Sequence, residues 1–105
     1  MSEEWVNVAS TADLAEGNMM GVTIGDKEIA IFNIGGVYSA TSNLCTHAYA
    51  FLTDGWLDGE NVECPLHAGI FEVKTGKGMG PPIGEDLKVY PVRVSGDAIE
   101  VNIAA

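Results

Sequence analysis

Two short stretches, Cys45-Thr46-His47 and Cys64-Pro65-Leu66-His67, decide how this chain is interpreted. They contain the only two cysteines and the only two histidines among its 105 residues. Random placement would rarely give two tight Cys/His pairs, and thiolate and imidazole are common ligands of zinc and iron. The pattern therefore predicts one metal site with four ligands: Cys45, His47, Cys64 and His67.

The order of residues within each pair bears on which metal the site holds. Zinc accepts two cysteines and two histidines, so the ligand count alone leaves a zinc-binding interaction module open. Zinc fingers, however, pair Cys with Cys and His with His, whereas each pair here is mixed. Mixed pairs suit a binuclear iron–sulfur cluster, in which one iron takes both thiolates and the other takes both imidazoles. A disulfide between the cysteines would leave the histidine pairing unexplained.

The composition indicates a small, strongly acidic protein. Fifteen Asp and Glu against five Lys and Arg give a formal net charge of −10. That charge repels nucleic acids and anionic lipids and favours partners with basic surfaces. The length predicts one domain over residues 1–105. The sequence has neither a secretory signal nor an apolar run long enough to cross a membrane, so we expect a cytoplasmic protein with reduced thiols.

Short strand-like runs recur along the chain and predict an all-β fold. Gly25-Asp26-Lys27 is typical of a hairpin turn, and one short helical turn is expected within residues 11–17. Regular structure fails between about residues 43 and 84, and long irregular loops in a compact domain are usually functional. The expected strands cover residues 5–9, 20–24, 28–34, 37–41, 61–63, 69–73, 87–90, 91–94 and 98–103.

The two pairs form the pattern C-x-H-x16-C-x-x-H, and further segments accompany it: Asn43-Leu44, Leu52-Thr53-Asp54-Gly55, Val62-Glu63, Gly69-Ile70-Phe71, Thr75-Gly76-Lys77 and the run from Leu87 to Val92. Together they resemble the Rieske-type [2Fe–2S] ferredoxins of bacterial aromatic-ring-hydroxylating dioxygenase systems. The resemblance implies the Rieske fold, a small antiparallel β-sandwich base with an inserted loop-built cluster-binding subdomain. It also implies one Rieske-type [2Fe–2S] cluster, with Cys45 and Cys64 on one iron and His47 and His67 on the other.

The same resemblance implies an electron carrier and no catalytic residues. A ferredoxin of this kind takes electrons from an NAD(P)H-dependent flavin reductase. It passes them to a terminal Rieske non-haem iron oxygenase that acts in aromatic hydrocarbon catabolism. We expect a monomer that never touches the aromatic substrate. A small Rieske subunit of another redox enzyme, such as a nitrite-reductase-like complex, stays as the alternative.

Two positions after the second histidine bear on the reduction potential. High-potential respiratory Rieske proteins carry Ser and Tyr hydroxyls where this chain has Gly69 and Phe71, and they have a further disulfide that this chain lacks. Fewer donors to sulfur stabilise the reduced cluster less, so we expect a potential at the low end of the Rieske range. Ala48 departs from the glycine that is usual in the family, but all four ligands remain.

Three further features carry structural expectations. Trp5 and Trp56 are expected in core packing, although Trp56 lies between the two pairs and could instead shield the cluster or meet a partner. Pro81-Pro82 is expected to stiffen a third loop that covers the cluster.

Overall fold

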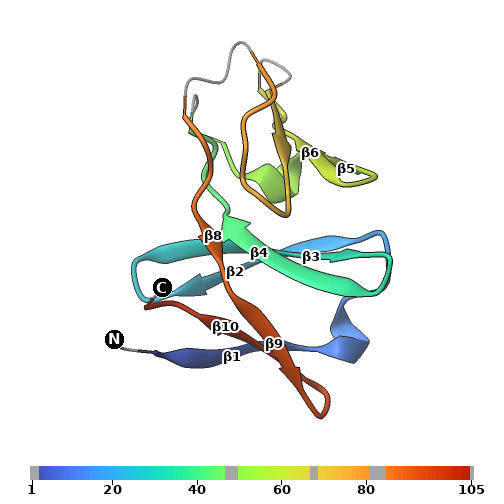
Figure 1. Cartoon of the computed structure of the whole chain (residues 1–105), viewed down its shortest axis with the longest axis vertical. Helices are drawn as coiled ribbons and strands as arrows, with labels where there is room; N and C mark the ends of the chain where they lie inside the picture. Colours follow the sequence, from blue (N-terminus) through green and yellow to red (C-terminus); the bar gives the residue numbers. More distant parts are fainter. Residues whose placement is uncertain (1–2, 47–49, 67–68, 81–84, 105) are drawn as a thin grey trace.

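The protein is described by a computed structural model that covers residues 3–46, 50–66, 69–80 and 85–104. Within these ranges the chain forms ten β-strands and two short 3-10 helices, and no α-helix. No helix in these ranges is long and apolar enough to cross a membrane. The strands make two sheets in a base and a third, smaller sheet in a tip above it (Figure 1), which confirms the predicted all-β class.

The base consists of two antiparallel sheets. One sheet has the order β1 (Trp5–Ser10), β10 (Ala98–Asn102), β9 (Val92–Ser95). The other has the order β2 (Met19–Ile24), β3 (Lys27–Ile34), β4 (Val37–Ser42), β8 (Val89–Tyr90). Apolar side chains of both sheets share one core, in which Ile29 and Ile31 join Ile99 and Val101. This is the β-sandwich base that the resemblance to Rieske ferredoxins implied.

The tip is a small sheet between two loops. Its strands are β5 (Trp56–Asp58), β6 (Asn61–Glu63) and β7 (Ile70–Glu72), paired antiparallel in that order. A 3-10 turn, η2 (Leu52–Asp54), precedes β5. The other 3-10 turn, η1 (Thr11–Asp13), follows β1 in the base. The sequence predicted β6 and β7 but missed β5, a run of three residues that lies between two glycines.

Strand β3 separates two hydrophobic cores. Its residues Ile29 and Ile31 pack into the base, whereas Ala30 and Phe32 pack into the tip core. All four side chains are fully buried. Successive side chains of a strand point to opposite faces, so an uninterrupted apolar run is what a strand between two cores requires. The tip therefore packs against the face of β3 that is opposite to the core of the base.

Asn43 joins the base to the tip through four hydrogen bonds. Its backbone N–H donates to the Glu28 carbonyl at 2.8 Å, and its carbonyl accepts from Leu52 N–H at 2.8 Å. Its side-chain amide donates to Thr53 Oγ1 at 3.0 Å and accepts from Thr53 N–H at 3.0 Å. A buried amide is stable only when its polar atoms are paired, so these bonds fix the direction in which the chain leaves the base.

Gly55→Ala should destabilise the tip by about 3 kcal/mol, the upper end of overpacking costs. A Cβ at Gly55 would collide with the Glu63 carbonyl oxygen and lie 3.1 Å from Pro65 Cδ, next to Cys64. The control is Gly59→Ala, where a Cβ meets nothing within 4 Å and only the φ of +59° is strained, at about 1 kcal/mol. Thermal midpoints at one scan rate measure both variants. Equal midpoints would show that the close approach at Gly55 does not matter.

Candidate metal centre

Two loops at the top of the tip begin with the cysteines and are closed in the same way. Cys45 N–H donates to the Ala50 carbonyl at 3.0 Å, and Cys64 N–H donates to the Gly69 carbonyl at 2.7 Å. Each bond spans five residues along the chain. The closures fix both cysteines at the start of a tight loop, and the sequence of each loop contains one histidine.

The residues that flank each loop also pair alike. Leu44 forms an antiparallel bridge with Phe51, and Glu63 pairs antiparallel with Ile70 at the end of β6 and the start of β7. Each cysteine loop is thus the end of a hairpin, and backbone pairing holds its base. Cys45 and Cys64 therefore occupy equivalent positions in their hairpins, directly after a paired residue, although the two loops differ in sequence.

Both cysteines are buried in the tip core. Cys45 is 7% exposed, Cys64 is fully buried, and neither forms a disulfide. They share one hydrophobic cluster with Leu52 and Phe71 and with the apolar residues that β3 contributes. The structure therefore brings the two predicted thiol ligands together in the tip core, away from solvent.

The surroundings of Cys64 fit a thiol that binds a cation. Burial raises the pKa of the Cys64 thiol from 9.0 to about 11; the Leu66 N–H lowers it, and contact with the Cys45 thiol raises it further. The Leu66 N–H lies 3.5 Å from Cys64 Sγ, in position to stabilise negative charge on that sulfur. A buried thiol becomes a thiolate when a metal replaces its proton, so the donor set fits an iron held by two cysteines.

Residues 85–88 form a strap that ties the segment of Cys45 to the turn after β7. Thr46 Oγ1 donates to the Glu85 carbonyl at 2.8 Å, and Ser42 N–H donates to the Lys88 carbonyl at 2.8 Å. On the other side, Leu87 N–H donates to the Gly76 carbonyl at 2.7 Å. The strap therefore ties the segment that carries Cys45 to the chain that follows β7.

The other predicted site residues divide into two groups. Gly69 and Phe71 are buried, and Phe71 packs in the same cluster as both cysteines. His47, His67, Ala48 and Pro81-Pro82 lie outside the described residues. Their roles stay predictions.

The core-packing prediction for Trp56 is wrong. Its side chain is 59% exposed, because it points away from the tip core on the first strand of the tip sheet. Trp5 is partly buried at the edge of the base, and its ring stacks with Arg93.

Sequence reasoning missed Asn43 and Thr46 as residues that position the site. Both sit within two residues of Cys45, and each has a side chain that can bond to the backbone of a neighbouring segment. The available signal was a polar residue within two positions of a ligand. The sequence did not show which segment each side chain would reach.

Comparison with known proteins places the chain in a family. A model described as "Rieske [2Fe-2S] domain" matches residues 4–91. The ferredoxin component of the naphthalene 1,2-dioxygenase/salicylate 5-hydroxylase systems of a Ralstonia species is 45% identical over 90% of both chains. The ferredoxin component of the naphthalene 1,2-dioxygenase system of Pseudomonas aeruginosa is 38% identical over 99% of this chain and all of that one.

A solved structure shares the fold. The chain matches one in a complex of reduced oxygenase and oxidised ferredoxin of carbazole 1,9a-dioxygenase with a TM-score of 0.89 and 34% identity. The match covers 93% of this chain and 92% of that one. With its two buried cysteines and all-β base, this chain belongs to the Rieske [2Fe-2S] domain family.

Proposed function

We propose that the protein is the ferredoxin component of a bacterial aromatic-ring dioxygenase system, a one-electron carrier and not an enzyme. The observation that carries the proposal is the pair of matched cysteine loops in a chain that aligns end to end with ferredoxin components of such systems. In the terminal oxygenase of a carbazole 1,9a-dioxygenase, the part that matches this chain is only 30% of a longer chain. Here the similarity to a free-standing ferredoxin extends over the whole sequence.

Four residues hold the cluster in this proposal. Cys45 and Cys64 bind one iron, and His47 and His67 bind the other. Support comes from the burial of both thiols in one core and from the position of each histidine in the sequence of a cysteine loop. When bound, the [2Fe–2S] group takes up and releases one electron.

The described side chains keep the cysteine side of the site dry. Leu52 and Phe71 are fully buried against the two thiols. Excluding water lowers the local dielectric, so charge on the sulfurs depends on the few donors nearby, of which the Leu66 N–H is one. Because Gly69 and Phe71 add no hydroxyl there, a low potential follows.

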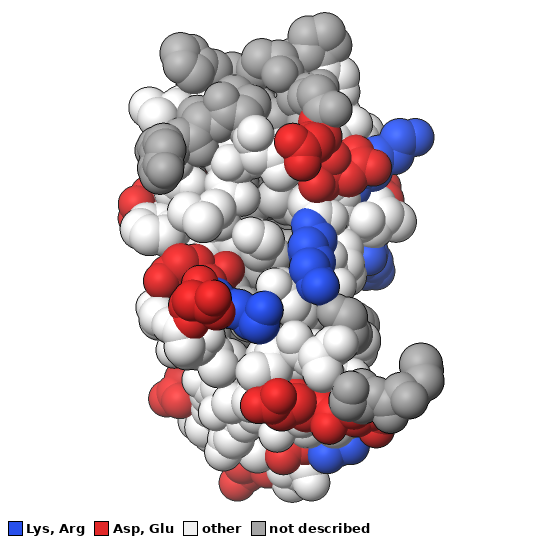
Figure 2. Space-filling view, turned by 90° about the vertical axis from the view of Figure 1, so that its left-hand side faces the viewer, with Lys and Arg blue, Asp and Glu red and all other residues white. Residues whose placement is uncertain are grey.

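The partners in this proposal are a flavin-dependent reductase and a terminal oxygenase. The carbazole dioxygenase structure supports the oxygenase, since it contains a ferredoxin with an oxygenase. The net charge of −10 favours partners with basic surfaces. Acidic side chains form separate groups along one face of the molecule (Figure 2), with much uncharged surface between them.

Residues 1–105 form one Rieske domain in this proposal. The family model ends at residue 91, but the remaining strands β9 and β10 complete the base. Strand β10 pairs with β1 on one side and with β9 on the other, so the last strands hold the first one. The two cysteines form no disulfide with each other, which agrees with a protein of the reducing cytoplasm. We also propose that it is a monomer.

Electron transfer tests the proposal directly. The chain, reduced with dithionite and freed of excess reductant, should pass its electron to an oxidised terminal oxygenase of the naphthalene or carbazole system. Loss of the reduced spectrum in a stopped-flow instrument reports the transfer. Cys64→Ser should lack the reduced spectrum altogether, whereas the control Leu66→Ala, in the same loop, keeps the backbone N–H and should transfer normally. Loaded protein that retains its electron with both oxygenases would contradict the proposal.

Gly69→Ser combined with Phe71→Tyr should raise the reduction potential. A hydroxyl that donates to sulfur bonds more strongly as negative charge builds, so it favours the reduced state. A gain of about 1.4 kcal/mol would raise a one-electron potential by roughly 59 mV. Voltammetry measures the change, and Phe71→Leu, which alters packing without adding a hydroxyl, is the control. An unchanged or lower potential with the cluster intact would refute this explanation of the low potential.

A further inference from the structure

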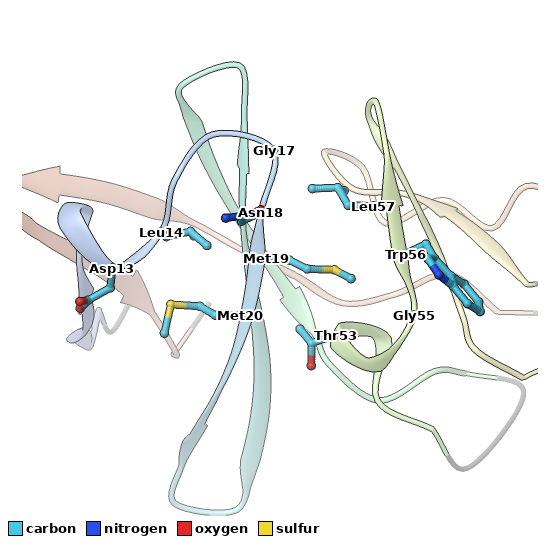
Figure 3. A pocket seen from close by; sticks show the side chains of 10 residues that line it. All are labelled: Asp13, Leu14, Gly17, Asn18, Met19, Met20, Thr53, Gly55, Trp56 and Leu57. Atoms are coloured by element: carbon cyan, nitrogen blue, oxygen red, sulfur yellow. The ribbon is translucent and has the colours of Figure 1, made fainter.

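The outer face of the tip sheet carries side chains that do not belong to the tip core. Leu57, Val62 and Phe71 lie across from one another in register and pack inward. The neighbouring row, Trp56, Glu63 and Ile70, therefore lies on the opposite face. Figure 3 shows the same alternation, with Leu57 pointing from β5 toward Met19 and Trp56 pointing to the other side.

This row is exposed at the end that Trp56 occupies. Trp56 is 59% exposed and pairs directly with Glu63, which places the two Cβ atoms about 5 Å apart. At the other end, Ile70 is half-buried, and Met79, whose N–H donates to the Ile70 carbonyl at 2.8 Å, is 50% exposed. An indole ring thus stands beside a carboxylate on a solvent-facing sheet.

The base of the same protein contains a tryptophan and a carboxylate joined by an arginine. The Arg93 guanidinium lies 4.2 Å from the centre of the Trp5 ring. Its Nε donates to Glu100 Oε1 at 2.7 Å. Stacking and a charge-assisted hydrogen bond act together there, as the planar guanidinium allows.

In the tip, the described residues do not supply the corresponding cation. Arg93 is the only arginine of the sequence, and it is engaged in the base. Lys74 pairs with Glu60 and Lys88 lies over Tyr90, while the remaining tip lysine, Lys77, follows β7 across from Glu72. Within the part of the chain that the structure describes, no cation stacks on Trp56 and no ion pair involves Glu63.

We propose that Trp56 and Glu63 form a docking surface for a partner protein that presents an arginine. The partner's guanidinium stacks on the exposed indole and donates to the Glu63 carboxylate, as Arg93 does between Trp5 and Glu100. Asp58 and Glu72 lie two rows along the sheet, on the same face as Trp56, and their carboxylates add negative charge to the surface. Charge complementarity thus selects a basic partner.

The docking surface adjoins the metal centre. Glu63 is the residue before Cys64, and Gly55, before Trp56, lies against the Glu63 carbonyl. A partner seated here would approach the cysteine side of the site. The identification of the partner as an electron-transfer protein rests on the proposed function. The preference of the surface for arginine does not depend on it.

Binding of short cationic peptides tests the preference for arginine without any partner. Fluorescence anisotropy of labelled octa-arginine and octalysine, at one ionic strength, gives two dissociation constants for the loaded protein. Octa-arginine should bind about fivefold more tightly, which corresponds to about 1 kcal/mol of stacking. Trp56→Ala and Glu63→Gln should each reduce this ratio toward one.

Two control variants change other exposed side chains: one loses an apolar group and the other loses a carboxylate. Val37→Ala removes an exposed apolar side chain from the base, and Glu16→Gln removes one exposed carboxylate. Both should keep the preference for octa-arginine, although overall binding weakens slightly in Glu16→Gln. An unchanged ratio in Trp56→Ala would overturn the proposal.

Kinetics with the reductase and the oxygenase test whether the surface serves electron transfer. Trp56→Ala should raise the half-saturating ferredoxin concentration about fivefold with one of the two partners, at unchanged iron content and potential. Unchanged half-saturation with both partners would show that neither docks here. A failure of the proposed function would give another result. The unmodified protein would then transfer no electron to either partner, but it would still bind octa-arginine more tightly than octalysine.

Discussion

The arrangement of the whole molecule depends on burying both faces of β3. Ile29 and Ile31 close the core of the base, and Ala30 and Phe32 form the floor of the tip. At about 25 cal/mol per Å² of apolar surface, such a strand stabilises two layers at once. A polar residue at any of these four positions would leave an unpaired group in one of the two cores. The tip can therefore contain long loops, because part of its core is supplied by β3, a strand of the base.

On this foundation the chain repeats one device to place two thiols. Each cysteine follows a backbone bridge and donates its N–H to the carbonyl five positions later, across a loop of four residues. Hairpin ends of this kind fix backbone direction without much side-chain packing, which leaves the loop residues available for metal ligands. The strap at residues 85–88 then ties the first loop to the chain beyond β7. The cysteines are thus preorganised in a dry core, as a site with low reorganisation on electron transfer requires.

Much of this could be predicted from the sequence, and the failures have physical causes. The two Cys/His pairs have an unusual spacing, and the long strands β3 and β10 have strong apolar patterns, so the family and the base were predictable, whereas the full set of four ligands stays a prediction. Strand β5 has only three residues and is held by its neighbours, so local propensity gave little signal. Trp56 was predicted in the core because large aromatic side chains are usually buried. Only the register with β6 shows that it points outward. Hydrogen bonds between distant segments, such as Thr46 to Glu85, leave no local pattern at all.

The central claim is that two cysteines and two histidines of this chain hold one [2Fe–2S] cluster. Pulsed electron paramagnetic resonance of the dithionite-reduced protein, labelled with 15N only at histidine, tests it most directly. The account predicts a signal with couplings from two histidine nitrogens bound to iron, since the sequence contains two histidines. It further predicts that His47→Ala and His67→Ala each remove this signal. A reduced iron–sulfur signal without histidine coupling, or a protein that holds zinc and no sulfide, would contradict the account.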